Sequence, residues 1–257
     1  RNGDYDFSHE VHNSMMGCLA CKSCAGQCPI KVDVPEFRSK FLELYYSRYL
    51  RPLKDYFIGG LEFMIPTLAR VPWLYNAAMK PKFMQKILAK VAGMVDSPLL
   101  TGISLQTELN KLGVQWATLE NITQLTPEQK TKAVILVQDA FTSYFETPVV
   151  LDSLKVLQSL GFTPLVAPFK PNGKPLQVHG FLNAFAKAAD INATLLNGLA
   201  SSGIPLIGLD PAMTLAYRGE YQKLLGANAP KVQLIQEWLV TQQDSLAARK
   251  ANFRSGD

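Results

Sequence analysis

Short apolar runs alternate with helically spaced apolar residues in the second half of the chain. Buried strands are expected over 133–137, 163–167 and 204–209, because apolar residues there follow one another almost without interruption. Helices are expected between them over 147–160 and 179–200. This alternation of strands and helices predicts a parallel sheet with right-handed crossovers.

Helix boundaries in this half are marked by particular residue types. Asp210, which precedes a proline, is expected to cap a helix, and Thr126 is expected to open a short one. Gly161 is expected to end the helix that begins at residue 147. His179 is expected to start a helix, and residues 232–239 are expected to lie in the last one.

The first half of the chain favours helices. Asp33 is expected to cap a helix over 34–50, with Glu36 at the capping-box position. Its apolar stripe should pack beside the loop that precedes it. The stripe consists of Val34, Phe37, Phe41, Leu44 and Tyr45. Residues 53–100 are interrupted by glycine and proline and are expected to form short helices.

Composition and charge limit the classes of function. The chain has 257 residues, 47% hydrophobic and 18% charged, which is typical of a folded protein. The net charge of +5 is too small to indicate a nucleic-acid partner. The positive excess lies in residues 31–90, which hold eleven Lys or Arg and five Asp or Glu. This segment is expected to be a helical core with a solvated basic face; contact with a membrane surface or an acidic partner is the alternative. No apolar stretch is long enough to predict a transmembrane helix.

All four cysteines lie within eleven residues, at Cys18, Cys21, Cys24 and Cys28, and Pro29 follows the last. Disulfides between them would close only very short loops. A structural zinc site usually pairs two Cys-x2-Cys knuckles that are a dozen or more residues apart. The spacing Cys-x2-Cys-x2-Cys-x3-Cys-Pro is instead typical of an iron–sulfur ligand run. The sequence therefore predicts a [4Fe–4S] cluster held by these four residues.

Several details of this predicted site stay open. Cys28 either completes the cluster, which we favour, or ligates a second cluster whose other ligands lie on a missing segment. His9 and His12 are alternative nitrogen ligands, although two surface histidines are the simpler interpretation. Donors to the sulfurs are expected to be the backbone N–H groups of Ala20, Ser23 and Gly26. Positive charges that favour the reduced cluster are expected from Lys22 and Lys31.

The second half has no recognisable nucleotide-binding signature. The turn after the first predicted strand, residues 138–141, lacks the Gly-x-Gly-x-x-Gly pattern, and no phosphate-binding loop of the Walker type occurs. Asp139 and Asp210 fall at predicted carboxyl ends of strands, where open α/β sheets place their sites. Helix capping explains Asp210 equally well. We therefore predict no catalytic residue in this chain.

Several segments resemble large FAD-linked D-2-hydroxyacid dehydrogenases of the bacterial D-2-hydroxyglutarate or D-lactate type. The segments that carry the resemblance are Cys18–Arg38, Leu136–Thr142, Pro168–Lys174, Asp210–Met213 and Tyr217–Arg218. In that family a flavin domain removes hydride from the hydroxyacid. A C-terminal half carries an iron–sulfur cluster and a cysteine-rich domain of the heterodisulfide-reductase kind.

The resemblance implies that this chain is a truncated C-terminal iron–sulfur region of such an enzyme. FAD would then lie on a part of the parent protein that is not present here. The expected partners are the flavin domain, on the same polypeptide or on a partner subunit, and an electron acceptor, either a quinone or a soluble carrier. The chain departs from the family because it lacks a Cys-Cys-Gly motif and a cysteine near Ala216.

Taken together, the sequence predicts an α+β or α/β protein. An all-helical ferredoxin-like [4Fe–4S] domain is expected over 1–115, followed by a smaller α/β domain of the cysteine-rich type, with a parallel sheet, over 116–257. One alternative is a separate electron-carrier subunit of a glycerol-3-phosphate dehydrogenase or heterodisulfide-reductase-like complex. Another is a zinc-stapled interaction module. Unpaired thiols and the lack of an export signal favour the cytoplasm, or a peripheral position at the inner membrane face.

Overall fold

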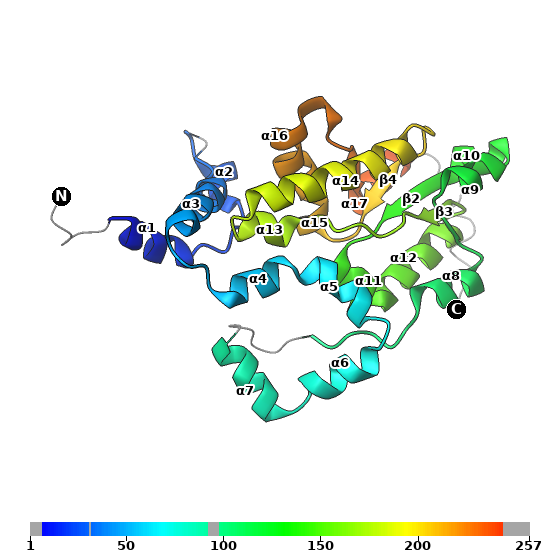
Figure 1. Cartoon of the computed structure of the whole chain (residues 1–257). Helices are drawn as coiled ribbons and strands as arrows, with labels where there is room; N and C mark the ends of the chain where they lie inside the picture. The colour runs from blue at the N-terminus through cyan, green and yellow to red at the C-terminus, as the bar shows by residue number, and fades with distance from the viewer. Residues whose placement is uncertain (1–6, 31, 92–97, 244–257) are drawn as a thin grey trace. The chain divides into compact units, whose positions relative to one another are not determined.

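The computed structural model describes residues 7–30, 32–91 and 98–243 (Figure 1). The chain divides into two compact units, and each is composed of segments that are far apart in the sequence. The helical unit comprises Arg1–Met64, Lys80–Ser97 and Gly173–Ala188. The sheet unit comprises Ile65–Met79, Pro98–Asn172 and Ala189–Asp257. The sheet unit contains more of the chain, whereas the sequence led us to expect a smaller α/β part.

The helical unit consists of short helices, as the sequence predicted. Its helices are α1 (Phe7–Met16), α2 (Ser23–Gln27), α3 (Val34–Arg48), α4 (Leu53–Gly59), α7 (Lys82–Val91), α13 (Lys174–Val178) and the first turns of α14 (Leu182–Ala200). Helix α5 (Leu61–Leu68) begins in this unit and ends in the sheet unit. No helix among the described residues is long and apolar enough to cross a membrane.

Helix α3 begins where predicted but buries a different face. The Asp33 side chain accepts a hydrogen bond from the Glu36 backbone N–H, which confirms the cap. The predicted stripe is wrong, because Phe37 and Leu44 are 53% and 70% exposed. The residues that α3 buries are Pro35, Arg38, Ser39 and Leu42. Polar partners from α13 and the chain after it explain why an arginine and a serine lie on the inner face.

The sheet unit is built on a five-stranded, all-parallel sheet with the strand order β1-β3-β2-β4-β5. The strands are β1 (Gln115–Trp116), β2 (Ala133–Val137), β3 (Thr163–Val166), β4 (Leu206–Gly208) and β5 (Val232–Leu234). The predicted parallel sheet and its three central strands are confirmed. The edge strands β1 and β5 were not predicted, and β5 had been assigned to a helix. Two or three residues are too short to produce a recognisable apolar run.

The sheet unit also contains most of the helices of the described chain. They are α6 (Pro72–Met79), α8 (Leu105–Leu112), α9 (Leu119–Gln124), α10 (Pro127–Lys132), α11 (Ala140–Tyr144), α12 (Thr147–Ser159), α15 (Pro211–Ala216), α16 (Gln222–Leu225), α17 (Ile235–Thr241) and the rest of α14. A π-helical turn (Tyr217–Tyr221) precedes α16, and a 3-10 turn (Gly226–Asn228) follows it. The expected caps of α10 and α15, Thr126 and Asp210, accept backbone hydrogen bonds from those helices.

The core of the sheet unit lies between one face of the sheet and helices α8, α12 and α17. Its central side chains are Leu109, Val134, Leu136, Val150, Leu154, Leu157, Val166, Ile207 and Trp238. Side chains alternate between the faces of a strand, so Ile135, Leu165 and Leu206 point to the opposite face. Figure 1 shows α12 and α14 on opposite sides of the strands. Burial on both faces explains why the strands consist of continuous apolar residues.

The expectation that His179 starts a helix is wrong. His179 lies directly after α13, before the turn that leads to α14. Gly180 follows it with φ of 69°, a left-handed conformation that glycine adopts without strain. A Cβ at Gly180 would lie 2.7 Å from the Leu42 Cβ and 2.8 Å from the Ser39 carbonyl oxygen. The absence of a side chain at position 180 therefore allows this turn to lie directly against α3.

We predict that Gly180→Ala destabilises the protein by about 2–5 kcal/mol, because strained backbone and overpacking add. Gly203→Ala is the matched control, because Gly203 has φ of 81° and no atom within 4 Å of its added Cβ. It should lose only about 1–2 kcal/mol. Urea unfolding of both variants measures the difference, and equal losses would show that the contact with α3 is unimportant.

Candidate functional site

The four cysteines lie in the helical unit, between the end of α1 and the start of α3. Cys21 and Cys24 are exposed, Cys18 and Cys28 are half-buried, and no disulfide joins them. Among the described residues, no group of three or more His, Cys, Asp or Glu side chains lies close enough to hold a metal ion. The residue types fit an iron–sulfur cluster, since all four are thiols, although this conformation does not bring their sulfurs together. The ligand set therefore stays a prediction.

The backbone between these cysteines is strained. Ala20 and Lys22 have φ of 55° and 61°, and they are the non-glycine residues with positive φ in the described chain. Each such residue costs about 1–2 kcal/mol, and strain of this kind concentrates where a chain is shaped for a ligand. Lys22 directly precedes the short helix α2, which contains Cys24.

Ser23 supplies polar contacts to one of the sulfurs. The Ser23 backbone N–H and then its hydroxyl, whose Oγ lies 3.6 Å from the Cys21 Sγ, lower the pKa of the Cys21 thiol. A lower pKa increases the fraction of thiolate, the form that binds metals. This contact agrees with the expected role of Ser23. Gly26 differs from the expectation, because its N–H donates to the Lys22 carbonyl oxygen instead.

Arg38 anchors the chain that leads into the cysteine segment. The Met15 carbonyl oxygen accepts hydrogen bonds from the Cys18 backbone N–H at 3.1 Å and from Arg38 Nε at 3.2 Å. Arg38 is buried on α3, and its Nη1 also donates to the Val178 carbonyl oxygen at 2.6 Å. One guanidinium thus connects α3 to the residues before Cys18 and to the end of α13.

His9 and His12 contact aromatic side chains of α3. His9 Nδ1 lies 2.6 Å from the Tyr45 hydroxyl, and the His12 ring stacks on the Tyr45 ring with centroids 4.4 Å apart. His12 Nε2 lies 3.2 Å from the Tyr46 hydroxyl. These contacts favour a packing role between α1 and α3 over the alternative role as nitrogen ligands.

A second polar cluster surrounds His179. The Asp55 carboxylate lies 3.3 Å from His179 Nδ1. Arg51 donates to the carbonyl oxygens of His179 and Gly180, and its guanidinium lies 3.9 Å from the centroid of the Phe181 ring. Together with Arg38 from α3, these contacts hold the turn after α13 against α3 and α4.

The pKa values of Tyr46 and Asp55 in this cluster are shifted. Burial, followed by the negative charge of Asp55, raises the pKa of Tyr46 to about 12. Burial alone would raise the pKa of Asp55, but the hydrogen bond from His179 and the positive charges of His179, Arg51 and Lys54 outweigh it and lower the pKa. The cluster borders a cavity of about 100 Å³ that is also lined by Arg38 and Met16.

The two aspartates at the ends of strands cap helices. Asp139 accepts hydrogen bonds from the backbone N–H groups of Phe141 and Thr142, and Asp210 accepts one from Met213. Burial raises the pKa of Asp139, and the charge of Asp210 adds to this, against the hydrogen bonds that lower it. The contacts therefore support the capping interpretation.

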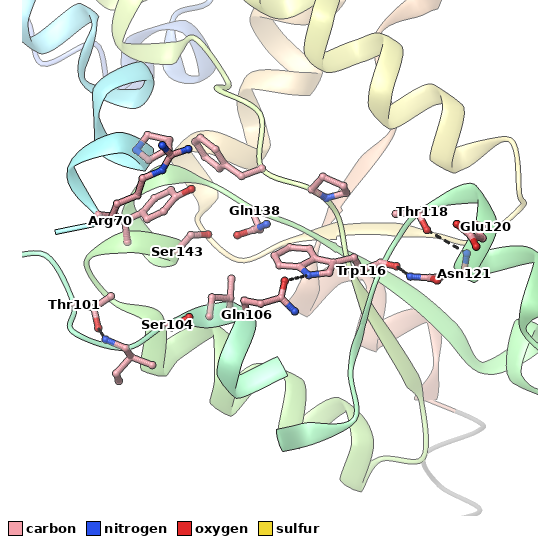
Figure 2. Close-up of a pocket in the computed structure, with 17 residues that line it drawn as sticks. Arg70, Thr101, Ser104, Gln106, Trp116, Thr118, Glu120, Asn121, Gln138 and Ser143 are labelled. Carbon is pink, nitrogen blue, oxygen red and sulfur yellow. Dashed lines mark hydrogen bonds between the residues drawn. The ribbon is translucent and has the colours of Figure 1, made fainter. Parts of the chain in front are cut away.

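A cavity of about 630 Å³ lies at the carboxyl end of the sheet, entirely within the sheet unit (Figure 2). Its lining includes Arg70, Trp116, Gln138 and Ser143. None of these residues was a candidate from the sequence. Gln138 follows β2 directly, so the strand pattern could have indicated it. No pattern in the sequence could have indicated Arg70, since it is far from the strands along the chain.

Comparison with known proteins shows strong similarity to part of one group of enzymes. The chain is 58% identical over 239 residues to a protein named D-2-hydroxyglutarate dehydrogenase from Pseudomonas putida. It is 47% identical over 245 residues to the protein of that name from Escherichia coli and 43% identical over 257 residues to that from Pantoea ananatis. These matches cover 93%, 95% and 99% of this chain, but 24%, 24% and 25% of those relatives.

The chain thus spans about a quarter of the length of the curated relatives it matches. The resemblance to D-2-hydroxyglutarate dehydrogenases is confirmed, and the chain corresponds to a part of these oxidoreductases. Their names do not mention an iron–sulfur cluster, so the cluster stays a prediction. No protein-family model matches the chain, and no solved structure is a significant match.

We predict that Asp55→Asn reduces the loss of stability in acid. The pKa of Asp55 in the folded protein lies below the usual value of about 3.9. Its carboxylate therefore stabilises the fold above about pH 4, and this contribution disappears as the pH falls through the lowered pKa. Urea unfolding between pH 5 and pH 3 should show a smaller decline for Asp55→Asn than for the unsubstituted chain. The exposed Asp152→Asn serves as control, and parallel declines in all three proteins would contradict the prediction.

Proposed function

We propose that this chain is the electron-transferring iron–sulfur segment of an FAD-linked D-2-hydroxyglutarate dehydrogenase. The observation that carries the proposal is the run of four thiols ending in Cys28-Pro29, within a chain that is 58% identical to part of such an enzyme. Under this proposal the helical unit contains a ferredoxin-like [4Fe–4S] domain. We assign no catalytic residue to the chain.

The proposed ligands are Cys18, Cys21, Cys24 and Cys28. Oxidation of a 2-hydroxy acid releases two electrons, and single-electron transfer from reduced FAD to an acceptor is the chemistry that a bound [4Fe–4S] cluster supplies. The residues of this chain would ligate the cluster, orient it and shield it from water. Ser23 would donate hydrogen bonds to sulfur, and Arg38 would position the residues before Cys18 through the Met15 carbonyl.

The proposed partners follow from this role. FAD would belong to a flavin domain of the parent protein, or to a partner flavoprotein subunit. The acceptor would be a quinone or a soluble carrier, and the site of action would be the cytoplasm or the inner face of a membrane. A separate electron-carrier subunit, as in glycerol-3-phosphate dehydrogenase or heterodisulfide-reductase-like complexes, is disfavoured because those proteins usually carry two cysteine runs. A zinc-stapled module is the remaining alternative.

Helix α7 supports the peripheral membrane position. It presents Phe83 and Ile87, which are 64% and 47% exposed, together with Lys82, Lys86 and Lys90. Exposed apolar residues combined with lysines on one short helix are typical of segments that lie in the interface of an anionic membrane. We propose that α7 makes this contact.

We predict that Cys21→Ser removes the iron. The chain purified without air should contain about four iron and four sulfide per molecule and should absorb visible light. The variant should lose most of the iron, sulfide and absorbance while the sheet unit stays folded. The matched control is Ser14→Ala, since Ser14 is also a small residue close to the run and its hydroxyl donates to the Glu10 carbonyl oxygen within α1.

Electron paramagnetic resonance of the reduced protein tests the ligands in more detail. If Cys28 completes the cluster, Cys28→Ser should convert a four-iron signal to a three-iron signal or abolish it. Stoichiometric zinc without sulfide would support the zinc-stapled module. Unchanged iron and colour in Cys21→Ser would refute the ligand assignment.

We also predict that α7 binds anionic vesicles. Each lysine near such a surface contributes about 1 kcal/mol, so replacing Lys82, Lys86 and Lys90 with Gln should weaken binding about 100-fold. Flotation with phosphatidylglycerol–phosphatidylcholine vesicles measures this, with pure phosphatidylcholine as the neutral comparison. The control replaces Lys111, Lys130 and Lys155 of the sheet unit with Gln. Equal binding of both triple variants would contradict the role of α7.

A further inference from the structure

The cavity at the carboxyl end of the sheet has the position and size of a ligand site. Residues just beyond the carboxyl ends of β1, β2 and β3 line it, and these include Thr118, Gln138 and Pro168. In open parallel sheets, ligands bind outside the carboxyl ends of the strands. The volume of about 630 Å³ lies within the range of about 300–1,000 Å³ that is usual for small-molecule pockets. The cysteines are not part of it.

Two buried polar groups line this cavity. Gln138 is buried, and its Nε2 donates to the Ala167 carbonyl oxygen at 2.7 Å, which fixes the orientation of its amide. Ser143 is only 3% exposed, and its Oγ has no hydrogen-bond partner among the described residues. A buried hydroxyl without a partner costs about 1–3 kcal/mol, so a ligand that bonds to it would recover this energy.

Charge in the cavity is limited to two groups at opposite ends. Figure 2 shows Arg70 at one end and Glu120 at the other, with Gln138, Ser143 and Trp116 between them. The Arg70 guanidinium forms no ion pair with a carboxylate among the described residues. One guanidinium suits an anion with a single charge. A multiply charged phosphate would be repelled by Glu120 and is poorly matched to one arginine.

Aromatic side chains form part of the cavity wall. Trp116, Tyr144 and Phe169 line the cavity and are each half-buried. Trp116 Nε1 donates to Gln106 Oε1 at 2.5 Å, and the Tyr144 and Phe169 rings meet edge to face with centroids 5.2 Å apart. These contacts orient the rings, and an aromatic ring offers a face against which a planar group can pack.

We propose that this cavity binds a small planar carboxylic acid. Its carboxylate would contact Arg70, its ring would pack against Trp116, and a polar substituent would hydrogen-bond to Ser143 Oγ. This site is separate from the proposed iron–sulfur segment and would give the sheet unit a binding function of its own.

Three related probes test each part of the proposal by isothermal titration calorimetry on the full chain. 6-Hydroxy-2-naphthoate carries the carboxylate, the planar body and a hydroxyl. 2-Naphthoate lacks the hydroxyl, and 6-hydroxy-2-naphthamide lacks the charge. We expect the first to bind tightest. The amide should bind about tenfold or more weakly, because a hydrogen bond to a charged group is stronger than a neutral one.

Variants assign these differences to particular residues. Arg70→Gln should weaken binding of both naphthoates about tenfold or more and leave the amide unchanged. Ser143→Ala should weaken 6-hydroxy-2-naphthoate while leaving 2-naphthoate unchanged, and it should not reduce stability because the hydroxyl has no partner. The controls are Arg48→Gln and Ser159→Ala, which lie outside the cavity. Near-ultraviolet circular dichroism verifies the fold of each variant.

Three results would overturn the proposal. These are the absence of naphthoate binding at millimolar concentration, naphthoate binding that Arg70→Gln does not change, and inorganic phosphate that binds as tightly as naphthoate. Iron content is measured on the same samples. Naphthoate binding in a chain without iron would count against the proposed electron transfer alone, so the two proposals fail separately.

Discussion

Two arginines, Arg38 buried and Arg51 half-buried, hold a distant segment of the chain onto helices α3 and α4, and the helical unit depends on this contact. Arg38 and Arg51 donate to the carbonyl oxygens of Val178, His179 and Gly180, more than 120 residues away in the sequence. Carbonyls in a turn have no helical partners and must find donors when they are buried. Guanidinium groups supply several donors in fixed geometry. The arginines therefore supply hydrogen-bond donors to the carbonyl oxygens of the turn, and these oxygens supply acceptors to the arginines.

The same contact determines where the cysteine segment begins. Arg38 also bonds to the Met15 carbonyl, which accepts the Cys18 N–H as well. At its other end, the segment is fixed by the Asp33 cap of α3. Both ends are thus tied to α3, while Cys21 and Cys24 between them stay exposed. The shape of this loop depends on the close spacing of its cysteines and on the strained residues Ala20 and Lys22, and little on a hydrophobic core.

Local patterns predicted the helices and central strands well, because capping, glycine and apolar runs act over a few residues. Strand β2 was predicted to the residue, since burial on both faces makes all five of its side chains apolar. Contacts over long distances were not predictable. The inner face of α3 carries Arg38 because its partner Val178 returns from elsewhere in the chain. The cavity at the carboxyl end of the sheet was missed for the same reason, because Arg70 is brought close to the ends of the strands only by folding.

Iron ligation by this segment would depend on the ionisation of its cysteines. Thiols must lose their protons to bind iron, and several thiolates brought together repel one another unless a cation lies among them. The lowered pKa of the Cys21 thiol identifies one sulfur that already favours the ionised form. Ser23 supplies this stabilisation locally, through its backbone N–H and its hydroxyl.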